Sequence, residues 1–195
     1  MKILHTADWH LGTFRSPVKD GVNLRTEDTK RCLNEMIRVA GEERPDYSLV
    51  SGDIFHSGKT WSDRCCEEIV TATHYIKELA AVSKQVVVMR GTPNHDGIGL
   101  FNVLAQTFEP FPNVHIVITP QVIPFEDVDI ALIPGFDRGI FRANHSGISA
   151  DEENLVFTEE LSNIVTGLKA QCSLEKKSIP VSYTHLRAHE TRRHL

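Results

Sequence analysis

Three short polar clusters in this sequence carry side chains that can bind metal ions or transfer protons. They are Asp8-Trp9-His10, Gly52-Asp53-Ile54-Phe55-His56 and Gly91-Thr92-Pro93-Asn94-His95-Asp96-Gly97. Carboxylate, imidazole and amide oxygen together suit a divalent cation such as manganese, magnesium, iron or zinc, and clusters without cysteine disfavour a structural zinc site. One carboxylate can bridge two cations about 3.5–4 Å apart, which activates a water and holds a phosphate for in-line attack.

Each cluster follows a short apolar segment that we predict to be a buried strand. Segments 1–7, 46–52 and 84–91 are rich in branched side chains and end at polar residues or glycine. Because α/β sheets bind ligands beyond the carboxyl ends of their strands, we expect the clusters to converge. Strand alternation is expected to point Asp8 and His10 the same way. Each cluster alone is a weak signal, whereas three in this order are a strong one.

The remaining chain alternates further strands with helices. Further strands are expected at 114–118 and 128–135, and helices at 26–43, after an N-cap at Ser62, and at 151–172. Segment 138–154 is predicted to be a long surface loop, although the acidic residues 151–153 indicate a helix start favoured by the helix dipole. The alternation predicts a layered α/β fold.

Composition limits the class of protein. The chain has 195 residues, enough for one domain or a fragment of a larger protein, with 41% apolar and 24% charged residues. No run of 18 apolar residues and no secretory signal is visible, so we expect a cytoplasmic protein with no membrane partner. The four cysteines show no C-x-x-C spacing and are expected to be reduced thiols. A net charge of −5 argues against a generally basic nucleic-acid-binding surface, but bound cations can supply local positive charge.

The segments MKILHTADWHLG, GDIFH and NHDG resemble motifs of the metallophosphoesterases. The first is most similar to the SbcD-like nucleases, the nuclease subunits of bacterial SbcCD DNA-repair complexes. The likeness runs from residue 1 to about residue 110 and continues more loosely to about residue 180. It implies a β-sandwich flanked by helices (α/β/β/α), of which residues 1–180 would form only the N-terminal part.

The resemblance also implies ligands for two divalent cations. Manganese is the expected metal, and magnesium is the alternative. Asp8 and His10 would bind one metal, Asp53 would bridge both, and Asn94 would bind the second. The alternative interpretation is that these residues are only caps and turn formers. Asp96 is interpreted as a turn or supporting residue.

Two histidines receive catalytic roles from the resemblance. His95 would protonate the leaving 3′ oxygen, and His56 would be a supporting histidine near the phosphate; for His56 the alternative is an ordinary polar loop residue. The sequence departs from the family at one point. Thr92-Pro93 separates Gly91 from Asn94, where most members read Gly-Asn-His-Asp. The departure affects the expected loop geometry and leaves the expected ligands in place.

The function implied is that of a manganese-dependent DNA nuclease with 3′–5′ double-strand exonuclease and single-strand endonuclease activity. DNA, an SbcC-like SMC-type ATPase and a second copy of the full-length protein would be its partners. Two other classes stay open. One is a small-molecule phosphodiesterase or phosphatase on the same fold, and the other is a non-catalytic partner-binding module.

The last residues, VSYTHLRAHETRRHL, differ from the rest of the chain. The family supplies a later histidine and a Gly-His-x-His pair, but this chain contains neither Gly-His nor His-x-His. Residues 181–195 resemble translated adapter sequence, so we expect a non-native or disordered tail and an inactive fragment. One alternative is a native ending, in which Ile179-Pro180-Val181 begins the family's next strand and His185 serves as the missing ligand. The other is that His185 and His189 bind zinc at helical spacing.

Overall fold

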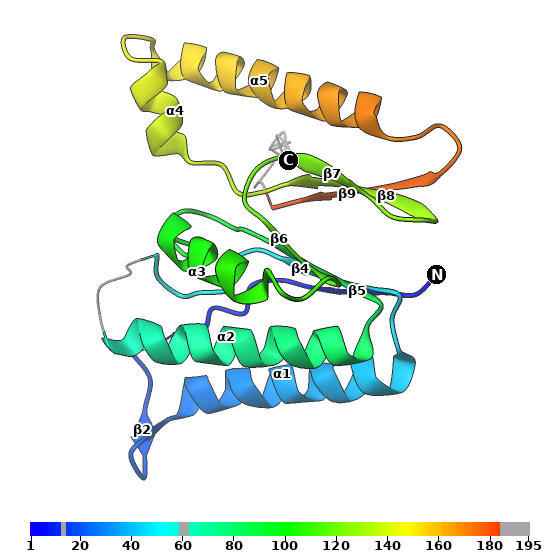
Figure 1. Ribbon diagram of the computed structural model, residues 1–195. Helices are drawn as coiled ribbons and strands as arrows, with labels where there is room; N and C mark the ends of the chain where they lie inside the picture. Colours follow the sequence, from blue (N-terminus) through cyan, green and yellow to red (C-terminus); the bar gives the residue numbers. More distant parts are fainter. Residues whose placement is uncertain (13–14, 59–62, 184–195) are drawn as a thin grey trace, which may run out of the picture.

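The computed structural model describes residues 1–12, 15–58 and 63–183, which form four stacked layers in the order helices, sheet, sheet, helices (Figure 1). The predicted α/β/β/α sandwich is therefore confirmed. The first sheet has the order β1-β4-β5-β6 and is parallel throughout. Its strands are β1 (Ile3–Thr6), β4 (Tyr47–Ser51), β5 (Gln85–Met89) and β6 (Val114–Val117).

Three helices cover the outer face of this sheet. They are α1 (Leu24–Glu43), α2 (Asp63–Val82) and α3 (Ile98–Phe108). The predicted N-cap at Ser62 lies outside the described residues. Strand β5 shows why the strands of this sheet are continuous apolar runs: Val86 and Val88 pack against the helices, while Val87 and Met89 pack against the second sheet. A sheet covered on both faces needs apolar residues at every position.

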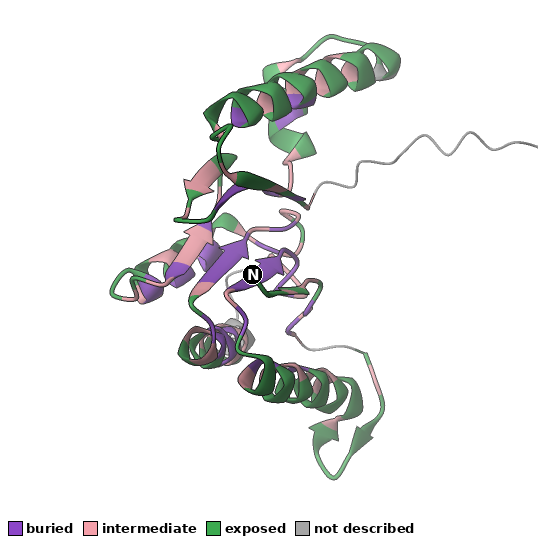
Figure 2. Cartoon of the chain, turned by 90° about the vertical axis from the view of Figure 1, so that its right-hand side faces the viewer, coloured by how far each residue is buried: buried purple, intermediate pink, exposed green. Residues whose placement is uncertain are grey.

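The second sheet lies on the other face of the first and has the order β7-β8-β9. Strands β7 (Gln121–Pro124) and β8 (Val128–Ile133) are antiparallel, and β9 (Lys177–Ser182) runs parallel to β8. Helices α4 (Arg138–Asn144) and α5 (Ala150–Gln171) form the fourth layer. Burial in the sheets is concentrated in β4, β5 and β8, while the helices turn largely exposed faces outward (Figure 2).

The predicted loop at 138–154 is wrong, because α4 and the first turn of α5 occupy it. Both helices have N-caps that the periodicity did not reveal. The Asp137 side chain accepts from the backbone N–H groups of Gly139 and Ile140, and Ser149 forms a capping box with Glu152. The acidic start expected for the second helix is confirmed, since residues 151–153 lie in its first turn.

Helix α3 and strand β7 were not predicted either, and two more segments differ from the sequence interpretation. A small hairpin, β2 (Val18–Lys19) and β3 (Val22–Asn23), precedes α1 and was not predicted. Strand β9 continues two residues past position 180, because backbone pairing with β8 carries it to Ser182 and buries Val181. The rest of the distinctive tail, 184–195, lies outside the described residues. Among the described helices, none has the length and apolar character needed to cross a membrane.

Candidate metal centre

The three polar clusters converge at the carboxyl ends of β1, β4 and β5. Backbone hydrogen bonds tie the first loop to the second: Asp8 N–H donates to Gly52 O and His10 N–H to Asp53 O, both at 3.0 Å. The second loop is tied to the third by Gly58 N–H, which donates to Asn94 O at 2.7 Å. Residues far apart in the chain are thus held on one edge of the parallel sheet, as expected for a ligand site.

The local backbone differs from the extended geometry that we predicted. Strand β1 ends at Thr6, and Asp8 and His10 have φ angles of 55° and 46°, as Asp53 does at 48°. Left-handed conformations cost non-glycine residues roughly 1–2 kcal/mol each, and such strain clusters at functional sites. The prediction that strand alternation orients Asp8 and His10 is therefore wrong, because both residues lie beyond the end of β1. Left-handed turns, fixed by the cross-loop hydrogen bonds, bring these side chains together.

Gly52 is required where the second loop meets the third. Its φ is 83°, and a Cβ at this position would lie 2.7 Å from Gly91 Cα. A side chain would therefore push the two loops apart as well as strain the backbone. Gly52 therefore permits the tight turn that brings the second loop against the third.

Asp8, His10 and Asp53 form a first set of donors, which we call the carboxylate group. Their candidate ligand atoms all lie within 4.8 Å of one another. Asp53 is 4% exposed, whereas Asp8 is open to solvent. His10 Nε2 lies 3.8 Å from Asp8 Oδ1. The Oδ1 atom of Asp53 accepts two hydrogen bonds from Thr92, from its N–H at 2.7 Å and its hydroxyl at 2.9 Å. Its Oδ2 atom lies 3.9 Å from His95 Nε2.

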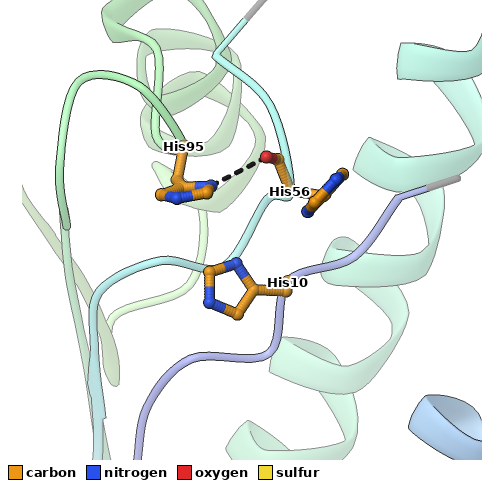
Figure 3. A group of neighbouring side chains, drawn as sticks. All are labelled: His10, His56 and His95. Atoms are coloured by element: carbon orange, nitrogen blue, oxygen red, sulfur yellow. Dashed lines mark hydrogen bonds between the residues drawn. The ribbon is translucent and has the colours of Figure 1, made fainter. Parts of the chain in front are cut away.

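A second set of donors, which we call the imidazole group, consists of His10, His56 and His95 (Figure 3). It shares His10 with the carboxylate group, and its candidate ligand atoms also lie within 4.8 Å of one another. His10 and His95 are the closest pair, with ring centroids 4.6 Å apart. The Nδ1–H of His95 donates to the backbone carbonyl of His56 at 2.7 Å, which leaves Nε2 for the site. Burial lowers the pKa of His56 below its usual value, with further lowering by the neighbouring His10 and His95.

Asn94 lies in the third loop, next to His95, and is exposed. Its backbone carbonyl takes part in the tie to Gly58. The structure thus places Asn94 in the same loop cluster as the carboxylate and imidazole groups. Its expected role as a ligand of the second cation stays a prediction.

The donors fit a divalent cation. Within the described part of the chain, His10 Nδ1 is a buried side-chain nitrogen with no hydrogen-bond partner. An orphaned buried nitrogen needs an explanation, and a place at a metal ion is one of the usual ones. Two carboxylates and an imidazole on neighbouring loops suit manganese, magnesium or zinc.

Asp96 braces the loops without joining either donor group. It is fully buried, its Oδ1 accepts from Phe55 N–H at 3.0 Å, and its Oδ2 accepts from Gly91 N–H at 2.7 Å. Burial is the largest influence on its carboxyl and raises the pKa to about 6, while the backbone donors lower it and the charge of Asp53 raises it. The predicted supporting role of Asp96 is confirmed. Asp53 and Asp96 form reciprocal ties, since each accepts from the other's loop.

Sequence reasoning missed two residues of this site, Thr92 and Tyr183. The only signal for Thr92 was its departure from the family pattern. The Tyr183 hydroxyl donates to Asp8 Oδ1 at 2.6 Å. Burial, followed by the hydrogen bonds and charges of Asp8 and Asp53, raises the pKa of this phenol. No sequence signal marked Tyr183, because a strand beginning at 179–181 was only an alternative interpretation and Tyr183 was assigned to the tail.

Two comparisons with known proteins agree with this geometry. Residues 1–169 match the family model described as calcineurin-like phosphoesterase. The chain is also similar to the SbcD component of the nuclease SbcCD from Staphylococcus epidermidis, with 28% identity over 109 residues. That match covers 56% of this chain and 26% of the relative, so the chain spans about a quarter of the relative's length. Because the family model covers most of it, this chain belongs to the calcineurin-like phosphoesterases, hydrolases that act on phosphate esters with divalent metals.

Proposed function

We propose that this domain is the metal-binding part of a nuclease that hydrolyses phosphodiester bonds in DNA. The observation that carries the proposal is the convergence of the carboxylate group with His95, a potential proton donor, on one sheet edge. The similarity to a component of the SbcCD nuclease supports DNA over other phosphate esters as the substrate. The name SbcCD supports an SbcC-like partner, which we propose to be an ATPase that works with a homodimer of the whole protein.

In this proposal Asp8 and His10 hold one cation, Asp53 is shared by two, and Asn94 serves the second. Manganese is the expected metal, with magnesium as the alternative. When bound, such cations activate a water and offset the charge that develops on the phosphate. Thr92 fixes the orientation of Asp53 through its two hydrogen bonds to Oδ1, so that Oδ2 faces the site.

His95 is proposed to protonate the leaving oxygen. Its Nδ1–H is committed to the His56 carbonyl, so a proton on Nε2 is the one that can move to substrate. The same hydrogen bond fixes the direction of the ring, and the His56 ring lies beside it with centroids 6.1 Å apart. His56 is proposed to support the phosphate-binding side of the site.

Four donor side chains do not complete the coordination of two cations, and we propose that further histidines do so in the active protein. The 195-residue chain alone is then expected to bind Mn²⁺ weakly and to digest DNA slowly or not at all. Strong Mn²⁺-dependent digestion of linear duplex by the purified chain, abolished by Asp53→Ala, would contradict this part of the proposal.

The nuclease assignment is tested by expressing the domain with any sequence that follows it in its gene. Linear duplex DNA, a small phosphodiester and the monoester p-nitrophenyl phosphate are compared with Mn²⁺ present. We expect DNA digestion that Asp53→Ala eliminates. Preference for the small diester or the monoester would replace the nuclease by a small-molecule phosphodiesterase or phosphatase. If calorimetry detected no bound Mn²⁺, a non-catalytic binding module would be the better interpretation.

A further inference from the structure

The imidazole group offers a second kind of metal site, chemically distinct from the carboxylate group. Its three donors, His10, His56 and His95, all present imidazole nitrogens, and their candidate ligand atoms lie within 4.8 Å of one another. Figure 3 shows the three rings around a common space, each from a different loop. Nitrogen donors favour zinc over manganese, both by ligand type and by the general order of divalent affinities.

Two details of the geometry suit a zinc ligand set. Histidine ligands almost always donate their second ring N–H to a carbonyl or carboxylate, and His95 does so to the His56 carbonyl at 2.7 Å. His10 Nδ1 is buried with no hydrogen-bond partner among the described residues. Zn–N bonds of about 2.0–2.1 Å would require the nitrogens to approach to about 3.3 Å, a movement that side chains on loops can make.

We propose that His10, His56 and His95 form a zinc site that excludes manganese from the carboxylate group. A neutral imidazole has one free lone pair, so His10 can serve one cation at a time. Zinc on the imidazole group therefore withdraws His10 from Asp8 and Asp53. It also occupies the lone pair of His95 Nε2 in place of a proton.

Zinc binding follows from the ring geometry alone, whereas its inhibitory effect rests on the proposed function. If His95 donates the proton and His10 holds Mn²⁺, one bound Zn²⁺ removes both contributions together. An excess of zinc would then switch hydrolysis off without any change of fold.

The site is tested by direct binding to the untagged 195-residue chain. Calorimetry with Zn²⁺ is combined with Co²⁺ absorption spectra, because tetrahedral nitrogen-rich Co²⁺ absorbs visible light much more strongly than octahedral oxygen-rich Co²⁺. We expect one tight Zn²⁺, held at least ~10-fold more tightly than Mn²⁺, and a tetrahedral Co²⁺ spectrum. His56→Ala and His95→Gln should each weaken Zn²⁺ binding at least ~10-fold and abolish that spectrum. Thermal melts confirm that these variants fold.

Matched controls remove histidines outside the imidazole group. His74→Ala on α2 and His185→Ala/His189→Ala should keep Zn²⁺ affinity within about threefold of the original chain. The proposal is overturned if folded His56→Ala and His95→Gln retain Zn²⁺, if binding is lost with His185 and His189 instead, or if the chain holds no Zn²⁺ more tightly than Mn²⁺.

The exclusion of manganese has its own readout. The free Mn²⁺ ion gives an electron paramagnetic resonance signal that is lost on binding, so one equivalent of Zn²⁺ should restore it. Retention of bound Mn²⁺ beside Zn²⁺ would refute the exclusion. If Mn²⁺ does not bind at all, the proposed nuclease function fails, while the Zn²⁺ and Co²⁺ measurements still decide the imidazole site.

Discussion

The two sheets of this molecule contribute unequally to its chemistry. The first is parallel, and the loops after β1, β4 and β5 carry both donor groups. The second is mixed and packs its inner face, including Ile130 and Leu132, against Leu49 and Val87 of the first. Tyr183, directly after β9, reaches the donor groups through its hydrogen bond to Asp8. Aligned strand ends gather loops at one edge, whereas an antiparallel hairpin sends them to opposite edges.

Two buried aspartates illustrate the difference. Asp53 is 4% exposed and lies in a left-handed turn, where Thr92 holds one of its oxygens and the other faces His95. Asp129 is 2% exposed within β8, and its Oδ2 accepts from Ser173 N–H at 2.6 Å. The carboxylate of Asp53 is positioned to bind a ligand, whereas that of Asp129 stabilises the chain by a hydrogen bond to its backbone. Variants at these positions should therefore separate binding from stability.

The largest expected effect is at Asp53. Asparagine tolerates the left-handed backbone and keeps an oxygen for Thr92, so Asp53→Asn should fold normally. We expect it to lose Mn²⁺ affinity by at least ~100-fold, since even supporting residues of metal sites contribute 10–100-fold. Calorimetry gives the affinity, and a thermal melt gives the stability. Unchanged Mn²⁺ binding would remove Asp53 from the proposed ligands.

Asp129→Ala should produce the reverse pattern. Loss of a hydrogen bond to a buried charged acceptor costs about 1.5–3 kcal/mol, so the urea midpoint should fall while Mn²⁺ affinity stays within about twofold. Asp151→Ala, at an exposed position in the first turn of α5, is the control: it should leave Mn²⁺ affinity unchanged and cost only about 0.3–1 kcal/mol through the helix dipole. A loss of metal affinity in Asp129→Ala would show that the second sheet shapes the site more closely than the packing indicates.

The same contrast explains what could be predicted from sequence. The first sheet is evident in the sequence, because strands buried on both faces, such as β5, are continuous apolar runs that end at polar loops. The second sheet has a weaker pattern: β7 and β9 are short or contain proline, and α4 is only seven residues long. Tyr183 depends on the pairing of β9 with β8, which no local signal specifies. The left-handed turns at Asp8 and His10 are likewise fixed by hydrogen bonds between distant loops.

A smaller effect is expected from Thr92, which lies in the loop where the sequence departs from its family. Thr92→Val keeps the shape and the backbone donor but removes the hydroxyl that donates to Asp53 at 2.9 Å. Mn²⁺ affinity should fall about 10-fold, the lower end for supporting residues of metal sites. Thr92→Ser restores the hydroxyl and should recover most of the affinity. Equal affinities in the three proteins would mean that the backbone N–H alone orients Asp53.

The smallest effect concerns pH and compares one glutamate from each half. Glu68 on α2 lies against Gly12 in the first loop, and burial, followed by the charge of Glu67, raises its pKa to about 7. Glu152, at the start of α5, has its pKa lowered by its hydrogen bonds with Ser149. The two pKa shifts are therefore opposite in sign. A carboxyl group with a raised pKa is harder to ionise in the folded chain, so the chain loses stability as pH rises from the unfolded value, about 4.3, to about 7.

Glu68→Gln should abolish this loss, which we expect to be of order 1 kcal/mol because solvent reaches part of the group. The urea midpoint of the original chain should therefore be lower at pH 8 than at pH 5. The difference between the two pH values should be smaller for Glu68→Gln. Glu152→Gln should change the pH dependence of stability in acid instead. The stability contributed by ionised Glu152 is present above about pH 4.3 and is lost as the pH falls below it, so the urea midpoints of variant and original should converge there. If both variants shifted the pH profile in the same direction, the carboxyl beside Gly12 would be solvated like its counterpart on α5. The first loop would then be more open to water than its packing against α2 indicates.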